Sequence, residues 1–145
     1  MWCGVSDIAV RCKLFVLIMM MSNSCFAHVA KVFISFSMPE MSIKQWLQQA
    51  EKVHAQVYLR GFIDNSFKQT INKATLVIKD NSQGFLLDPK EFERYKIEKV
   101  PAVVFVDDNQ ESITVYGDVG LLPAAQLAAT RVESKAAKEV IEKLT

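Results

Sequence analysis

Few residues of this 145-residue chain have types and spacings that could perform covalent chemistry. Neither His28 nor His54 has a second metal ligand or a catalytic partner near it in sequence. The pair Asp107-Asp108 is typical of a tight turn, and no glycine-rich phosphate loop is present. The three cysteines all lie in the first 27 residues: Cys3, Cys12 and Cys25. These patterns favour a protein that works by binding over an enzyme, and we expect no metal or other cofactor.

The first 27 residues have the organisation of a secretory signal peptide. Arg11 and Lys13 form a basic start, residues 14–21 are an uninterrupted apolar run, and Ala27 is a small residue suited to a cleavage site. The apolar run is about half of the roughly 20 residues that a spanning helix needs. We therefore expect export to the periplasm, cleavage after Ala27 and no stable membrane anchor. Two alternatives stay open: lipidation at Cys25, and a start codon assigned too early.

Residues 28–145 predict one domain without disulfides. About 118 residues, rich in Phe, Val, Ile and Leu, are enough to bury a single core. Without the leader, the 17 basic and 16 acidic residues of the chain become 15 of each. A net charge near zero gives no electrostatic reason to expect nucleic acid or an anionic membrane as a partner.

Hydrophobic patterns predict strands at residues 32–36, 55–59, 74–78, 100–106 and 112–116. Helices are expected at residues 37–54, 66–73, 88–96 and 123–144, the last with a break near Thr130. Turns at 80–84 and 107–110 separate these elements, and the second makes the last two strands a hairpin. This order predicts an α/β fold, a mixed central sheet with helices on both faces. With a proline entering the first hairpin strand, it is the thioredoxin-like arrangement.

The segment Ser37-Met38-Pro39 lies where a redox protein of that fold carries its cysteines. Ser37 lacks the reactivity of an activated thiolate, so we expect it to cap the helix that follows. In that fold the proline opposite this turn is cis, and the backbone before it pairs with an extended peptide. We expect a cis Val100-Pro101 bond. The alternative is a trans proline that starts a strand, with Val100 already extended because it precedes proline.

The loop at residues 59–67 holds the most unusual polar cluster of the chain. Arg60, Asp64 and Asn65 stand between apolar residues, Gly61 permits backbone conformations closed to other residues, and Asp64 or Asn65 could cap the next helix. Two interpretations stay open: a structural loop closed by an Arg60–Asp64 pair, and a partner-binding loop near the strand ends, where open α/β sheets place their sites.

These segments together resemble the TrbC family of F-type conjugative transfer systems, the pilin-assembly proteins of bacterial type IV secretion. The matching stretches occur in order and cover about residues 31 to 122: residues 32–39, 59–67, 88–95, 97–102 and 115–119. The Arg-Gly and Asp-Asn-Ser loop is the most specific of them. Many members carry a long segment before the domain, and in this sequence the domain begins a few residues after the leader.

The resemblance implies a periplasmic, thioredoxin-like domain without redox cysteines that is needed for pilus assembly. It also implies a protein partner, a TraW-like protein or another pilus-assembly component. We therefore expect a non-catalytic assembly factor. Its candidate binding residues are Ser37, Met38, Pro39, Arg60, Asp64, Asn65, Val100 and Pro101. The rival hypotheses are a disulfide oxidoreductase or isomerase, which the missing cysteines disfavour, and a holdase chaperone for pilin.

Overall fold

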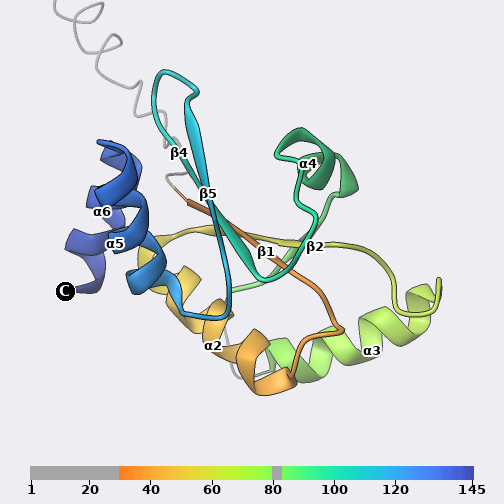
Figure 1. Cartoon of the computed structure of the whole chain (residues 1–145). Helices are drawn as coiled ribbons and strands as arrows, with labels where there is room; N and C mark the ends of the chain where they lie inside the picture. The colour runs from red at the N-terminus through yellow and green to blue at the C-terminus, as the bar shows by residue number, and fades with distance from the viewer. Residues whose placement is uncertain (1–29, 80–82) are drawn as a thin grey trace, which may run out of the picture.

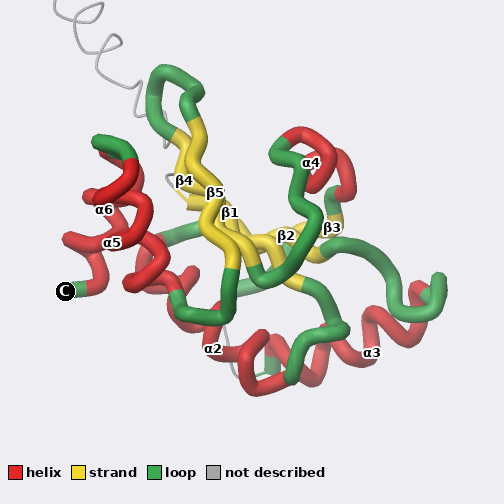
Figure 2. The backbone as a smooth tube through the Cα atoms, in the orientation of Figure 1, coloured by secondary structure: helices red, strands yellow, loops and turns green. Residues whose placement is uncertain are grey.

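A five-stranded mixed sheet forms the centre of the protein (Figure 2). The computed structural model describes residues 30–79 and 83–145. The expected leader, with its three cysteines and His28, lies outside the described residues. The strand order is β3-β2-β1-β4-β5. The strands are β1 (Ala30–Ile34), β2 (Gln56–Leu59), β3 (Leu86–Leu87), β4 (Ala102–Val106) and β5 (Ser112–Tyr116).

Strand directions follow the arrangement that the sequence predicted. β1 and β2 pair parallel, whereas β1 with β4 and β4 with β5 pair antiparallel. In the central register, Phe33 lies opposite both Tyr58 of β2 and Ala102 of β4. The α/β class and the order β2-β1-β4-β5 agree with a thioredoxin-like fold. β3 adds one short parallel strand outside β2.

The two faces of the sheet are covered unequally. Alternate residues of β1, such as Val32 and Ile34, face a large apolar core closed by four helices. These helices are α2 (Glu40–Val53), α3 (Phe67–Ile78), α5 (Leu121–Arg131) and α6 (Lys135–Leu144). Phe33 faces a smaller core, which the short helix α4 (Pro89–Arg94) covers with Phe92. Figure 1 shows α4 on the opposite side of the sheet from α2 and α3.

Most expected elements are present, and three differ. Residues 74–78, expected as a strand, are the last turns of α3, because Thr70, Ala74 and Val77 form a buried face at helical spacing. The expected break in the last helix falls at residues 132–134 and separates α5 from α6. The sequence patterns did not reveal β3, whose Leu86 and Leu87 are both exposed.

The C-terminal helices are tied to the sheet by one carboxylate of the β4–β5 turn. Asp107 Oδ1 accepts hydrogen bonds from Ser134 Oγ at 3.1 Å and from the backbone N–H of Ala136 at 2.8 Å. Ser134 also caps α6 by accepting from the N–H of Ala137. The turn expected at Asp107-Asp108 is confirmed, and Asp107 additionally fixes the start of α6. Within the described residues, no helix is both long and apolar enough to cross a membrane.

Candidate functional site

The candidate residues from three separate segments meet at one edge of the sheet. β1 and β2 are parallel, so the segments that follow Ile34 and Leu59 emerge on the same side. The N–H of Arg60 donates to the carbonyl of Ile34 at 3.1 Å and joins these two segments. β4 is antiparallel to β1, so Pro101, just before β4, starts at this edge as well.

The first segment leads from β1 into α2. Ser37 and Pro39 are exposed, whereas Met38 is buried at 8% exposure and packs in the large core. The expectation that Ser37 caps α2 is wrong. Pro39 occupies the cap position without a side-chain bond, and Ser37 Oγ instead donates to Ser35 Oγ at 3.1 Å. Ser37 and Pro39 are therefore accessible to a partner, whereas Met38 anchors the turn by packing in the large core.

The second segment contains the proline. The Val100-Pro101 bond is cis, as expected. Both residues are half-buried, and Val100 packs against both apolar cores. The carbonyl of Pro101 accepts a hydrogen bond from the N–H of Gly117 at 3.1 Å, which continues the β4–β5 ladder to the sheet edge.

Arg60 lies exposed beside a surface hollow of about 540 Å³ that separates it from α4. Its Nη1 donates to the backbone carbonyl of Glu98 at 3.2 Å. The structure gives no Arg60–Asp64 pair, so that structural interpretation is wrong. Because only one of its donors has a partner in the described chain, the guanidinium retains hydrogen-bonding capacity that faces solvent.

Asp64 and Asn65 form the centre of a tight turn. Both have left-handed backbone angles, with φ of 47° and 54°, and the N–H of Ser66 donates to the carbonyl of Ile63 at 2.7 Å. Ser66 caps α3 by accepting from the N–H of Gln69. The expectation that Asp64 or Asn65 caps this helix is therefore wrong. Gly61 has no left-handed backbone angle and no close neighbour, so the freedom of glycine is not used there.

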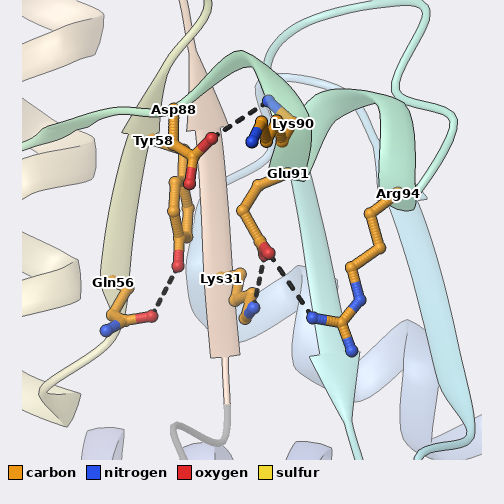
Figure 3. A network of polar contacts seen from close by, with 7 residues as sticks. All are labelled: Lys31, Gln56, Tyr58, Asp88, Lys90, Glu91 and Arg94. Atoms are coloured by element: carbon orange, nitrogen blue, oxygen red, sulfur yellow. Dashed lines mark hydrogen bonds and ion pairs between the residues drawn. The ribbon is translucent and has the colours of Figure 1, made fainter.

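A separate cluster of ionisable groups lies beneath α4 on the smaller core (Figure 3). Lys31 of β1 pairs with Glu91 of α4, and its ammonium lies over the rings of Tyr58 and Tyr95 at 5.5 and 5.0 Å. Tyr58 Oη donates to Gln56 Oε1 at 2.6 Å. No local sequence signal could have revealed this cluster, because Lys31 and Glu91 are 60 positions apart.

Burial and pairing act in opposite directions on these groups. Burial is the largest effect on the Lys31 ammonium and disfavours its charged form. The hydrogen bond to Glu91 and the interactions with the two tyrosines together outweigh burial, so the pKa of Lys31 is raised above its ordinary value. Burial also raises the pKa of the Tyr58 hydroxyl, although the nearby ammonium of Lys31 opposes this. Both side chains therefore stay protonated at neutral pH, and the cluster is a structural link between β1, β2 and α4.

The described part of the chain contains no cysteine, and within it no group of three His, Cys, Asp or Glu side chains could hold a metal ion. The site edge instead offers backbone groups, an arginine and exposed turns. Such an arrangement suits recognition of a polypeptide.

Comparisons with known proteins identify the family of the chain. A family model described as "Type-F conjugative transfer system pilin assembly protein" matches residues 32–127. The curated "Periplasmic protein TrbC" of Escherichia coli (strain K12) is 36% identical over 76 residues, which cover 52% of this chain and 36% of that protein. The match thus spans about a third of the relative's length. Its periplasmic location agrees with the export expected from the leader. No solved structure matches the chain.

Proposed function

Because the chain belongs to the family of type-F conjugative transfer system pilin assembly proteins, we propose that it supports pilus assembly in the periplasm by non-covalent contacts with protein partners. The observation that supports this most is the meeting of Ser37, Arg60 and Pro101 at one sheet edge. All three lie in segments by which the sequence resembles the TrbC family. A TraW-like protein is the partner that we propose.

The sheet edge suits an extended polypeptide for three physical reasons. Exposed turns at Ser37 and Pro39 leave room beside the strand ends, and the hollow next to Arg60 can receive a side chain. Arg60 can donate further hydrogen bonds to backbone carbonyls or to a carboxylate. The charges that line the hollow are balanced, because Arg60 and Lys96 offset two glutamates, Glu93 and Glu98. Specificity would therefore come from hydrogen-bond geometry more than from net charge.

Arg60→Ala should separate binding from stability. Arg60 is exposed and makes one hydrogen bond to a carbonyl, so its loss should change the free energy of unfolding by at most about 1 kcal/mol. An arginine that is buried by a partner contributes about 2 kcal/mol or more, which corresponds to a roughly 30-fold weaker dissociation constant. Thermal melts and titration with a purified TraW-like protein measure the two effects.

Arg131→Ala is the matched control, because Arg131 is also exposed but lies in the last turn of α5. It should bind the partner like the unmodified protein. If Arg60→Ala binds normally, or if it unfolds, the loop has a structural role and the edge site is wrong.

We further propose that the protein has no thiol chemistry. With its three cysteines all in the expected leader, the exported chain would have no nucleophilic sulfur. The purified exported form should neither reduce insulin nor reactivate scrambled ribonuclease above background, with or without glutathione. Turnover in either assay would favour the oxidoreductase alternative.

The holdase alternative uses the same sheet edge but differs in selectivity. A chaperone of that kind should bind many unfolded chains with similar affinity, whereas an assembly factor should bind one partner at a fixed stoichiometry. Competition between the TraW-like protein and an unfolded reference protein distinguishes them.

A further inference from the structure

Two phenylalanines lie side by side on the surface and do not contribute to the apolar cores. Phe62 and Phe67 are 45% and 65% exposed, and their rings meet edge to face with centroids 5.8 Å apart. Ile71, 46% exposed, lies one helical turn beyond Phe67 along α3. We call Phe62, Phe67 and Ile71 the aromatic patch. None of the three belongs to either apolar core.

The tight turn at residues 63–66 creates this patch. Ile63 and Ser66 form an isolated antiparallel bridge with Asp64 and Asn65 between them, so the flanking Phe62 and Phe67 are brought together as cross-strand neighbours. Left-handed angles at both central residues are the requirement of a two-residue hairpin turn. The two phenylalanines are therefore held in place by the backbone.

Thr70 locks the turn onto the first turn of α3. Its Oγ1 accepts from the N–H of Ile63 at 2.8 Å and donates to the carbonyl of Ser66 at 2.8 Å. Thr70 is 4% exposed, so these bonds are shielded from water. A rigid pair of aromatic rings binds a partner with little loss of side-chain entropy, which is an advantage for recognition and none for the isolated domain.

The charges of α3 restrict the occupant of the patch. The helix has no acidic residue, and its exposed Lys68 and Lys79 outnumber the one exposed carboxylate of the adjoining turn, Asp64. Lys73 points inward, where its ammonium donates to the carbonyl of Phe36 at 3.0 Å. A second copy of this chain docked through α3 would bring like charges together, which disfavours self-association. An acidic partner would complement them.

From these observations we propose that the aromatic patch docks an amphipathic helix of another pilus-assembly protein, with acidic residues beside its apolar stripe. Phe67 and Ile71, four positions apart, present the ridge that packs against such a helix. This inference rests on the proposed function and adds a second contact surface, formed by Phe62 and α3, which includes neither Arg60 nor the proline edge.

Photo-crosslinking in cells that carry the complete transfer system tests the proposal. Benzoylphenylalanine at position 67 should crosslink to one protein of the apparatus, in a segment with apolar residues at helical spacing and neighbouring Asp or Glu. The matched control is position 76. Leu76 is 63% exposed on α3 but lies about 140° around the helix from Ile71, so it should give no such product. The proposal is overturned if position 67 crosslinks to a second copy, to lipid or to a segment of other character, or if it gives no crosslink. Equal crosslinking from positions 67 and 76 overturns it as well.

A transfer assay separates this inference from the proposed function. In a strain lacking the gene, the double variant Phe62→Ser/Phe67→Ser should restore DNA transfer at least tenfold less well than the unmodified gene, while Leu76→Ser restores it fully. Thermal melts should show both variants folded. If the strain without the gene transfers DNA normally, the proposed function fails. If the gene is required and a folded double variant complements fully, only the aromatic patch is refuted.

Discussion

Replacing Glu91 by alanine should lower the free energy of unfolding by about 3 kcal/mol, because it leaves the ammonium of Lys31 without its counter-ion in a largely buried place. The side chains of Lys31 and Glu91 are only 13% and 15% exposed. The rings of Tyr58 and Tyr95 over the ammonium cannot replace a carboxylate. Urea denaturation followed by circular dichroism measures the loss.

The double variant Lys31→Met/Glu91→Met identifies the cause of that loss. It removes both charges and fills the space with apolar atoms, which is often neutral or stabilising at buried pairs, so it should be more stable than Glu91→Ala alone. Glu93→Ala, an exposed change on the same helix, should alter stability by less than about 0.5 kcal/mol. If the double variant is as unstable as Glu91→Ala, the unpaired ammonium is not the reason.

Asp118→Ala should lower the free energy of unfolding by about 2–4 kcal/mol, because two donors lose their acceptors and each buried, unsatisfied group costs about 1–3 kcal/mol. Asp118 lies in the loop from β5 to α5. Its carboxylate accepts from Ser42 Oγ at 2.6 Å and from Trp46 Nε1 at 2.8 Å. Ser42 and Trp46 are 8% and 1% exposed on α2.

Tryptophan fluorescence reports this change directly. The chain has two tryptophans, Trp2 in the expected leader and Trp46, so the exported form would carry Trp46 alone. Asp118→Asn keeps one acceptor oxygen and should lose less stability than Asp118→Ala. Asp108→Ala, in the exposed β4–β5 turn, should leave the unfolding midpoint unchanged. An Asp118→Ala protein as stable as the original would mean that water replaces both bonds.

Asp118 lies in a stretch that matches the family, but its contacts in the structure are within the fold. It belongs to residues 115–119, one of the stretches by which the sequence resembles the TrbC family. In the structure its role is to hold the β5–α5 loop against α2, and Gln49 does the same by accepting from the N–H of Leu121 at 2.6 Å. A polar loop residue within one of these stretches can therefore be structural.

Signals that act over a few residues were sufficient to predict much of the fold. Asp88 caps α4 and Pro89 occupies its first turn, as expected, because both effects depend only on the local backbone. Strands β1, β2, β4 and β5 follow from short apolar runs, and the hairpin from its turn residues. Their order alone was enough to predict a mixed α/β sheet, since few arrangements bury these elements in one core.

Interactions between distant segments decided the features that the sequence did not predict correctly. Residues 74–78 have strand-like composition but continue α3, because packing against the large core outweighs weak local propensity. Arg60 binds the carbonyl of Glu98, 38 positions away, and leaves Asp64 free to form the turn. The sequence suggested Asp64 as the partner of Arg60 because it is only four positions away. Only the tertiary fold brings the segment after α4, with Glu98, close to Arg60.

For function, the sequence alone was enough to name the candidate segments, and the tertiary structure decided how they lie relative to one another. Composition and the absence of cysteines beyond residue 27 directed attention to binding, and the loop at residues 59–67 was recognised as specific. Only the fold brings Ser37, Arg60 and Pro101 to one sheet edge, since parallel and antiparallel pairing set where each strand ends. Likewise, Phe62 and Phe67 look like core residues in the sequence. In the structure both are exposed, and the left-handed turn at Asp64 and Asn65 brings them together on the surface.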